Sequence, residues 1–428
     1  MSTTTTDSQT TAGSSAEARR SIIIIGALFF IFGFVTWLNS LLIPYLQIAN
    51  ELTLFQSYLV TFAFYIAYVV MAPVSTKTLN YFGFKKGMSV ALIVMALGAL
   101  LFIPAAMTRT YSVFLAGLFI MGSGLAVLQT ASNPFVTIVG PPEGAAKRMS
   151  IMGICNKMAG ALAPIILGAF LQLDKADELR ANIATLSDVD RIAELDAMAL
   201  RVIPPYIGII VVLLGLALWV YKSSLPEVDT NEEDEASVAS NAGKNSIFDF
   251  PHVILGVIAL FLYVGVEVIA ADTIISYGEQ QGLPLTTAKF FATATMVAMV
   301  IGYIIGIIII PKYIKQENAL KLCAILGISF TLLAIFTSGY VSLAFVALLG
   351  LANSLIWPAI WPLSLAGVGR FTNAASSLLV MGIAGGAIIP LAYGALADVW
   401  GAQQAYWIAI PCYLFILYFA VAGHKVRK

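Results

Sequence analysis

Long apolar runs alternate with short polar segments along almost the whole chain. Each run extends for about 20 residues or more, which is the length that an α-helix needs to cross a hydrocarbon core about 30 Å thick. The first run is too long for the core of a signal peptide, and no small-residue cleavage site follows it, so we expect it to be retained. The pattern predicts an all-α membrane protein with twelve transmembrane helices, at residues 21–46, 56–79, 87–106, 111–139, 148–172, 200–222, 252–277, 285–310, 319–338, 341–366, 372–397 and 402–423.

Two polar stretches are longer than the other loops. Residues 173–199 are mixed in charge and rich in helix-forming residues, and residues 223–250 contain the acidic run Glu232–Glu235. Such a run is more typical of a solvated linker than of a regulatory docking site. This linker separates two groups of six helices. The expected organisation is a disordered tail, a six-helix bundle, a linker, a second six-helix bundle and a second tail, at residues 1–20, 21–222, 223–250, 251–424 and 425–428.

The two groups of helices share a sequence frame. The frame Gly-x-x-x-Pro-x-x-x-Gly begins at Gly160 in the fifth run and again at Gly386 in the eleventh. The same register in equivalent runs is typical of parallel repeats related by an axis along the membrane normal. Small residues four apart also allow two helix backbones to approach closely. The frame therefore predicts two pseudo-symmetric halves around a central site, which is the plan of a transporter.

The short loops indicate an orientation. Lys and Arg concentrate in the cytoplasmic loops of membrane proteins. In this chain they gather in loops that lie on one side if both termini do, and the opposite short loops hold little beyond Arg109 and Lys289. We therefore expect both tails and the linker in the cytoplasm. The residues on that side are Arg19, Arg20, Lys85, Lys86, Lys147, Arg148, Lys312, Lys315, Arg370, Lys425, Arg427 and Lys428.

Composition matters mainly for what it excludes. Of the 428 residues, 60% are hydrophobic and 11% are charged, and the mean hydropathy is +0.91, so lipid must cover much of the surface. The formal net charge of zero argues against nucleic acid as a partner. The three cysteines lie inside apolar runs, and the two histidines lie far apart at run edges. We therefore expect no disulfide, no metal site and no cofactor.

Polar and aromatic side chains recur inside the runs in helical register. Amides and a carboxylate can each pair with two neighbouring hydroxyl groups, and indole rings fit the C–H face of a sugar ring. The set favours a neutral polyhydroxylated ligand over an anion or an organic cation. The alternatives are ordinary packing for the tryptophans and hydrogen bonds between helices for the amides. The expected substrate-binding residues are Trp37, Asn39, Gln129, Asn133, Asn156, Tyr263, Glu267, Asn353, Trp357 and Trp361.

Two charges lie deep inside apolar runs, Lys157 in the fifth and Glu267 in the seventh. A charge near the centre of a bilayer is costly, so it usually pairs with a partner or faces a watery cavity. We interpret Glu267 as the site of a coupling cation, either H⁺ or Na⁺, with which Lys157 competes in one state. Asp272, nearer the end of the seventh run, is the next candidate for coupling. A permanent Lys157–Glu267 pair, or a lysine that reaches up to water, explains the same residues without coupling.

Three stretches carry a resemblance to a known family, namely residues 34–39 (FVTWLN), 128–135 (LQTASNPF) and 263–267 (YVGVE). They resemble signatures of the fucose:proton symporter family of the major facilitator superfamily, which includes bacterial glucose/galactose and N-acetylglucosamine permeases. The resemblance covers nearly the whole chain and implies the major facilitator fold. It also implies secondary active uptake of a monosaccharide across the bacterial inner membrane.

The chain departs from the fucose transporter at two acidic positions. That transporter has an aspartate directly after the asparagine that matches Asn39, where this chain has Ser40, and a glutamate where this chain has Gln129. Neither replacement takes up a proton near neutral pH, so coupling must rest on other residues. Gln129 resembles the glucose/galactose and N-acetylglucosamine branch. We therefore expect glucose or galactose first, with an N-acetylglucosamine permease and an uncoupled sugar facilitator as the alternatives.

Two other classes of protein find little support in the sequence. A membrane-embedded enzyme needs a catalytic constellation, and the sequence offers no Cys–His pair, no cluster of His with acids and no metal-ligand spacing. A sensor derived from a transporter needs a substantial soluble signalling domain, and the two polar excursions are short. We expect a transporter that acts as a monomer and whose partners are its monosaccharide substrate and membrane lipid.

Overall fold

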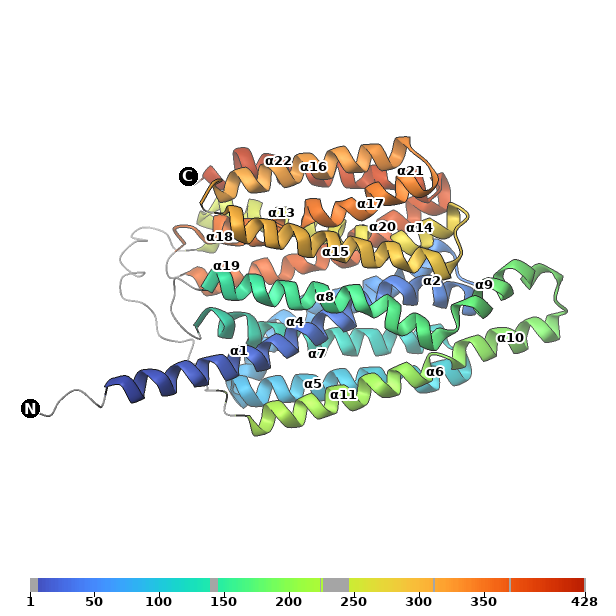
Figure 1. Ribbon diagram of the computed structural model, residues 1–428, viewed down its shortest axis with the longest axis horizontal. Helices are drawn as coiled ribbons and strands as arrows, with labels where there is room; N and C mark the ends of the chain where they lie inside the picture. Colours follow the sequence, from blue (N-terminus) through green and yellow to red (C-terminus); the bar gives the residue numbers. More distant parts are fainter. Residues whose placement is uncertain are drawn as a thin grey trace, which may run out of the picture.

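A computed structural model describes residues 7–138, 145–223, 225, 246–310, 312–368 and 371–426. Throughout these residues the chain forms α-helices joined by turns and short 3₁₀ segments, without a β-strand. The long helices lie side by side along the longest axis of the molecule (Figure 1). We call the end where α1 begins and α22 ends the terminus end. The opposite end, where α9 and α10 project, we call the distal end.

The first half of the chain supplies six membrane-crossing units and a projecting pair of helices. The helices of this half are α1 (Asp7–Trp37), α2 (Asn39–Ala49), α3 (Leu54–Ser57), α4 (Leu59–Phe82), α5 (Phe84–Leu100), α6 (Phe102–Thr108), α7 (Tyr111–Ile138), α8 (Ala145–Leu171), α9 (Leu173–Asn182), α10 (Asp188–Leu200) and α11 (Ile203–Lys222). The projecting pair is α9 and α10, so the polar stretch 173–199 forms helices as its composition predicts.

The second half repeats the pattern of six membrane-crossing units. The helices of this half are α13 (Pro251–Asp272), α14 (Ile274–Gln280), α15 (Leu285–Ile309), α16 (Gln316–Phe336), α17 (Gly339–Asn353), α18 (Ile356–Leu365), α19 (Thr372–Met381), α20 (Gly385–Trp400), α21 (Ala402–Ala405) and α22 (Ala409–Val421). Short 3₁₀ turns join several of them, including the turn between α19 and α20.

Within the described residues, twelve helical segments are long and apolar enough to cross a membrane. This number confirms the predicted fold class. The sides that face lipid are visible as apolar stripes at helical spacing. On α11 the stripe consists of Ile207, Val211, Leu214 and Leu218, which are 45–65% exposed. Large apolar side chains left exposed along one face of a long helix belong against acyl chains, so the protein is a multi-pass membrane protein.

The two halves pack against each other through two equivalent helix pairs, α8 with α15 and α4 with α20. The predicted glycine frames lie in these pairs. A Cβ atom on Gly386 would lie 2.9 Å from the ring of Tyr65, and one on Gly160 would lie 3.2 Å from the sulfur of Met296. Because α8 and α20 are the fifth and eleventh spans, and α15 and α4 the eighth and second, the interface repeats with the pseudo-symmetry that the sequence predicts.

The N-terminal tail differs from the prediction. The helix α1 begins at Asp7, so residues 7–20 are helical rather than disordered. The apolar span that follows nucleates the helix, and residues 16–20 (AEARR) include strong helix formers that extend it. Most of the predicted linker 223–250, including Glu232–Glu235, lies outside the described residues.

Several of the described helices are interrupted by short breaks, and three of these breaks lie beside predicted site residues. The helix α1 gives way to α2 at Leu38, α13 to α14 at Thr273, and α17 to α18 after Asn353. The last break precedes Pro358, which has no N–H group to donate to the carbonyl of Ser354, so the helix is weakest there. These breaks take the residues beside them out of regular helical register, and they decide where several of the predicted site residues lie.

Candidate functional site

A buried ion pair joins the two halves in the middle of the bundle. The Nζ atom of Lys157, on α8, lies 2.8 Å from Oε1 of Glu267, on α13, and the two side chains are only 8% and 10% exposed. Burying two charges is costly, and their attraction offsets that cost only when the geometry is close. The structure thus brings together the two deep charges that the sequence singles out, one from each half.

An indole ring covers the ion pair on the side of α1. The ammonium group of Lys157 lies 4.1 Å from the ring centroid of Trp37, which is within the range of a cation–π interaction. The Nε1 atom of Trp37 donates to Oδ1 of Asn156 over 3.2 Å. Gly160 leaves room for the ring, because a Cβ atom there would come within 2.5 Å of it. Trp37, Asn156 and Lys157 therefore form one contiguous group with Glu267.

Aromatic rings extend from Glu267 into the second half. Tyr263 lies one turn before Glu267 on α13 and shares its face. The ring centroid of Tyr263 is 6.4 Å from that of Trp357, and Trp357 stacks on Trp361 at 5.5 Å with an interplanar angle of 22°. Tyr263 is buried, whereas both tryptophans are partly exposed. A row of aromatic rings therefore leads from the ion pair to two partly exposed tryptophans.

The hydrogen bond of Gln129, on the fourth span, lies within the first half. Gln129, on α7, donates from Nε2 to the hydroxyl of Tyr68 on α4 over 3.0 Å. Tyr68 in turn stacks on Tyr65, the residue that packs on Gly386 of the second half. Gln129 is partly exposed. The side chain of Asn133, predicted to share its face, lies outside the described residues.

Two predicted amides are fully buried and incompletely paired. Asn39, the first residue of α2, is 0% exposed, and neither of its amide atoms has a hydrogen-bond partner within the described residues. Asn353, the last residue of α17, accepts at Oδ1 from the hydroxyl of Tyr413 on α22 over 2.9 Å. The break after Asn353 separates it from Trp357 and Trp361, with which the sequence pattern aligns it. Asn353 thus links α17 to α22 through a hydrogen bond. Asn39, beside the break in the first span, keeps its hydrogen-bonding capacity.

Asp272 lies in the interface between the halves, between Glu267 and the distal end. It is 0% exposed. Its Oδ2 atom accepts from the hydroxyl of Thr61 on α4 over 3.3 Å, and within the described residues its Oδ1 atom has no partner. The same part of the chain contains no group of three His, Cys, Asp or Glu side chains that could hold a metal ion. The third coupling candidate therefore contacts a neutral hydroxyl of the opposite half.

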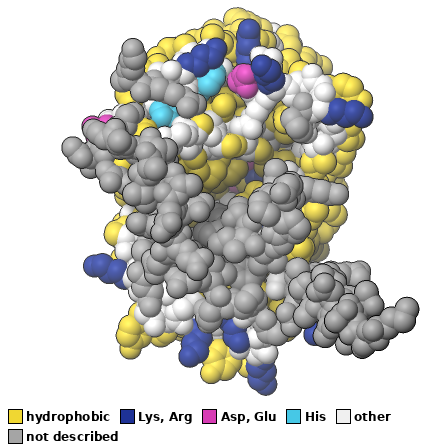
Figure 2. Space-filling view, turned by 90° about the vertical axis from the view of Figure 1, so that its left-hand side faces the viewer, with side chains coloured by type: hydrophobic (Ala, Val, Ile, Leu, Met, Phe, Trp, Pro, Cys, Tyr) yellow, Lys and Arg dark blue, Asp and Glu magenta, His cyan; other side chains and the backbone are white. Residues whose placement is uncertain are grey.

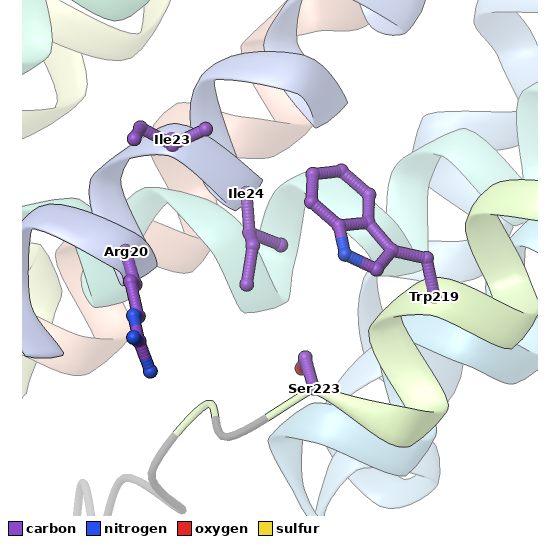
Figure 3. Close-up of a pocket in the computed structure, with 5 residues that line it drawn as sticks. All are labelled: Arg20, Ile23, Ile24, Trp219 and Ser223. Atoms are coloured by element: carbon purple, nitrogen blue, oxygen red, sulfur yellow. The ribbon is translucent and has the colours of Figure 1, made fainter.

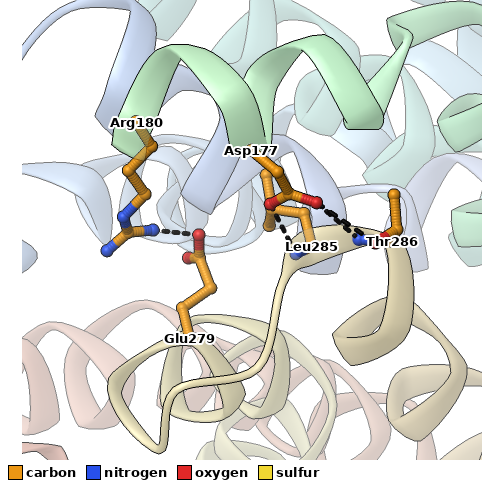
Figure 4. A network of polar contacts seen from close by, with 5 residues as sticks. All are labelled: Asp177, Arg180, Glu279, Leu285 and Thr286. Carbon is orange, nitrogen blue, oxygen red and sulfur yellow. Dashed lines mark hydrogen bonds and ion pairs between the residues drawn. The ribbon is translucent and has the colours of Figure 1, made fainter. Parts of the chain in front are cut away.

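Polar contacts between the halves hold the distal end shut (Figure 4). Asp177, on α9, accepts from the backbone N–H groups of Leu285 at 2.7 Å and Thr286 at 3.2 Å, and also from the hydroxyl of Thr286. These N–H groups begin α15 and have no partner within that helix, so a carboxylate there is strongly favoured. On the next turn of α9, Arg180 forms an ion pair with Glu279 of α14. The helix α9 of the first half is thus bound to α14 and α15 of the second half.

A second aspartate makes the same contact in the reverse direction. Asp398, on α20, accepts from the backbone N–H groups of Leu54 and Phe55, both at 3.0 Å, at the start of α3. Here a residue of the second half caps a helix of the first. Asp177 follows the fifth span and caps the eighth, and Asp398 ends the eleventh span and caps the second. The two caps are therefore related by the same pseudo-symmetry as the helix interface.

Glu279 contributes an almost fully buried carboxyl group to the distal contacts. Its side chain is only 4% exposed. Burial raises the pKa of Glu279 from its ordinary 4.5 to about 7, the positive charge of Arg180 lowers it, and the negative charge of Asp177 raises it slightly. The carboxyl therefore exchanges its proton near neutral pH when the distal end is closed.

A surface pocket of about 230 Å³ lies at the terminus end within the first half (Figure 3). Arg20, Ile23 and Ile24 of α1 line one side of it, and Trp219 and Ser223, from α11 and its end, line the other. It contains none of the predicted substrate-binding residues and does not lie between the halves. We therefore leave it outside the candidate site.

Known proteins share this architecture. The family profile described as Major Facilitator Superfamily matches residues 25–382. The glucose/galactose transporter of Brucella abortus (strain 2308) is 35% identical over 401 residues, covering 93% of this chain and 92% of that protein. The L-fucose-proton symporter of Escherichia coli (strain K12) is 31% identical over 403 residues, covering 92% and 91%. The crystal structure of FucP in the outward conformation aligns with a TM-score of 0.71 at 28% identity, covering 95% of this chain and 98% of that one.

Among the described residues, twelve spanning segments in two repeated halves that meet at a buried ion pair are the architecture of a membrane transporter. The chain belongs to the Major Facilitator Superfamily. The relatives are named as transporters rather than enzymes, and the resemblance to the fucose:proton symporter family and its glucose/galactose branch is confirmed.

The sequence gives little signal for the partners of the site residues. Tyr68, Tyr413 and Thr61, which bond to predicted residues, are of types that occur throughout spanning helices. Asp177 lies in a polar stretch where a charge is unremarkable. An acid at the end of an apolar run, as in residues 395–401 (ALADVWG), is the one signal that points to Asp398.

Proposed function

We propose that the protein takes up a neutral monosaccharide, with glucose or galactose as the first candidates, across the bacterial inner membrane by alternating access coupled to protons. The observation that carries this proposal is the Lys157–Glu267 pair, which joins the halves and is flanked by aromatic rings from both. The relatives named for glucose/galactose transport and for fucose–proton symport support the substrate class and the coupling ion.

The side chains that we propose as the substrate site suit a pyranose. The faces of Trp357 and Trp361 can stack on the C–H face of the sugar ring. The amides of Gln129 and Asn39 and the carboxylate of Glu267 can each bind two neighbouring hydroxyl groups. A ligand with several hydroxyl groups and no charge satisfies both kinds of surface.

Glu267 is the proposed site of the transported proton. In the present state its carboxylate is held by Lys157. A proton on Glu267 and a full ion pair with Lys157 exclude each other, because a neutral carboxyl loses most of the attraction of the ammonium group. Binding of the proton therefore weakens a contact between the halves, and its release restores that contact. This alternation links proton binding to the relative movement of α8 and α13.

The distribution of basic residues supports an orientation. Lys and Arg side chains gather at the rim of the terminus end (Figure 2), where Lys86, Lys222, Lys312 and Lys315 are exposed. By the positive-inside rule this end, with both chain termini, faces the cytoplasm and the distal end faces outwards. In this orientation the structure represents a state whose outer end is closed by the two aspartate caps.

The moving units in this proposal are the bundles at residues 21–222 and 251–424, joined by the linker 223–250. Rigid movement of two halves around a fixed central site is the usual way to expose that site to each side in turn. Residues of both halves within one chain make up the site, so a monomer is sufficient for transport.

Uptake into proteoliposomes tests the proposal. We expect radiolabelled glucose or galactose to accumulate when the outside is made acidic, and not when the proton gradient is collapsed. Accumulation that follows a Na⁺ gradient instead would reassign the ion, and uptake that stops at equilibrium under both gradients would identify a facilitator. Failure to take up any sugar of a panel that includes N-acetylglucosamine and L-fucose would contradict the proposal.

N-acetylglucosamine is the second candidate substrate. Its acetamido group needs an additional apolar notch beside the sugar ring. Small residues such as Ala131 on α7 or Ala359 on α18 could form one. If the panel shows preference for N-acetylglucosamine, replacing either alanine by valine should reduce that preference without affecting glucose.

Gln129→Ala should weaken sugar binding by roughly 1–3 kcal/mol, because a sugar hydroxyl loses its amide partner inside the protein. Isothermal titration of the purified protein measures the change in affinity. The matched control is Gln404→Ala, since Gln404 is exposed at the distal end, and its affinity should equal that of the native chain. Unchanged affinity in a correctly inserted Gln129→Ala variant removes this residue from the sugar site.

Glu279 should make closure of the outer end depend on pH. When that end opens, water reaches the carboxyl, and its pKa returns towards 4.5, whereas in the closed end it is about 7. Between these two pKa values the carboxyl is protonated in the closed state and ionised in the open state. The closed state therefore loses stability relative to the open state as pH rises from about 4.5 to about 7. Glu279→Gln should remove this dependence and favour closure above pH 7 by at most about 3 kcal/mol.

Pulsed electron paramagnetic resonance can measure this closure. Spin labels at Met107 and Tyr340, which are 68% and 62% exposed on the distal sides of the two halves, report the distance between the halves. The matched control is Glu178→Gln, because Glu178 is exposed on the same α9 helix. An unchanged pH response in Glu279→Gln means that this carboxyl does not titrate with closure.

A further inference from the structure

Asp272 lies in the part of the interface that must separate when the outer end opens. Its side chain is 0% exposed at the end of α13, in the second half. The hydroxyl that donates to it belongs to Thr61 of α4, in the first half, at 3.3 Å. Separation of the halves at this end therefore breaks the contact and admits water to the carboxyl. The surroundings of Asp272 change completely between the two states.

Within the described residues, the groups that bear on the carboxyl of Asp272 are neutral or negative. From α4 they are the phenols of Tyr58 and Tyr65. From the second half they are the carboxylate of Glu267 on the same helix and the phenol of Tyr406, which is hydrogen-bonded to the residue after Asp272. An ionised carboxylate among such groups is far less stable than a neutral one, because no positive charge replaces the water that it loses.

We propose that Asp272 is a second proton site, which binds a proton from the outside when the outer end closes and returns it to the outside when that end opens. The inference rests on the proposed alternating-access function and adds to it a proton that is not transported. One proton from external water binds to one carboxylate oxygen, and no other bond is made or broken. The hydroxyl of Thr61 can donate to the other oxygen in both protonation states.

This site gives the external pH a direct effect on the gate. Acid outside favours the closed end, because only the closed end requires the proton on Asp272. The transported proton on Glu267 follows a different route, since it leaves on the cytoplasmic side. Asp272 is therefore a positioning residue for the gate rather than a carrier of the coupling proton, and its loss should not change the number of protons that accompany each sugar.

The test measures closure of the outer end without any sugar. Spin labels at Met107 and Tyr340 are placed in the full chain, after its three native cysteines are replaced by alanine, and the protein is studied in lipid nanodiscs. Every variant also carries Glu279→Gln together with the pair Lys157→Met and Glu267→Gln, so that neither Glu279 nor Glu267 contributes to the pH response. In this background we expect the ratio of closed to open molecules to rise up to about tenfold for each unit by which pH falls, as binding of one proton requires.

Asp272→Asn should abolish that response, because asparagine has nearly the same shape and is neutral at every pH. The closed fraction should then be high and independent of pH. A slope that survives in Asp272→Asn, or a slope that is already absent with Asp272 present, overturns the proposal.

Thr61→Val separates proton binding from simple packing. It removes the hydroxyl that donates to Asp272 but leaves the carboxyl, so the pH slope should remain. If Thr61→Val abolishes the slope as Asp272→Asn does, the effect comes from the lost hydrogen bond and the proposal fails. The uptake assay is independent of this measurement, so a failure to transport sugar and a failure of Asp272 to titrate are distinguishable results.

Discussion

Glu267→Gln should abolish accumulation of sugar against its gradient while exchange of sugar across the membrane continues. Glutamine keeps the size and most of the hydrogen-bonding capacity of the glutamate but cannot bind a coupling proton. Exchange needs only the loaded carrier to reorient, whereas accumulation needs a cation to bind outside and leave inside. Uptake and counterflow of labelled sugar in proteoliposomes with an imposed pH gradient measure the two activities separately.

The control for this variant is Glu194→Gln, which removes a carboxylate from the exposed face of α10 and should accumulate sugar as the native chain does. If Glu267→Gln still concentrates sugar, Glu267 is a packing or sugar-contact residue. The transported proton must then bind elsewhere, and Asp272 becomes the next residue to test for that role.

Lys157→Met should destabilise the protein by roughly 3–5 kcal/mol, because it leaves the buried carboxylate of Glu267 without its partner. The charge of Lys157 also competes with the coupling cation, so the pH dependence of transport should change in the same variant. Thermal unfolding in detergent and uptake as a function of external pH measure the two effects.

The double variant Lys157→Met with Glu267→Gln distinguishes a lost pair from a lost lysine. It contains neither buried charge, so most of the stability should return even though accumulation does not. If the double variant is as unstable as Lys157→Met alone, the contribution of Lys157 comes from its packing against Trp37 and not from the ion pair.

The membrane spans and the central ion pair could be predicted because their signals are local. An apolar run of the right length must cross a bilayer, and a lone charge within it needs a partner, so Lys157 and Glu267 stand out in the sequence alone. The repeat of the glycine frame likewise predicts which helices of the two halves are equivalent. In these cases the physical constraint acts on each segment by itself.

The contacts that depend on helix breaks could not be predicted in the same way. Asn353 aligns with Trp357 in an unbroken helix, but the break before Pro358 turns it to Tyr413. Whether proline interrupts a helix before or after its own position depends on neighbouring packing. The role of Asp177 was equally hidden, since a cap between halves exists only when the start of α15 lies beside α9.

The two aspartate caps have a consequence for how the protein tolerates mutation. Apart from the hydroxyl of Thr286, the groups that donate to each carboxylate are backbone N–H groups, which almost every residue type possesses. Substitutions along the first turns of α3 and α15 can therefore accumulate without loss of either contact, with proline as the exception. Mutations that remove a cap should therefore fall mainly on the two aspartates themselves, Asp177 and Asp398. Natural variation should be wide at the capped helix starts and narrow at these two positions.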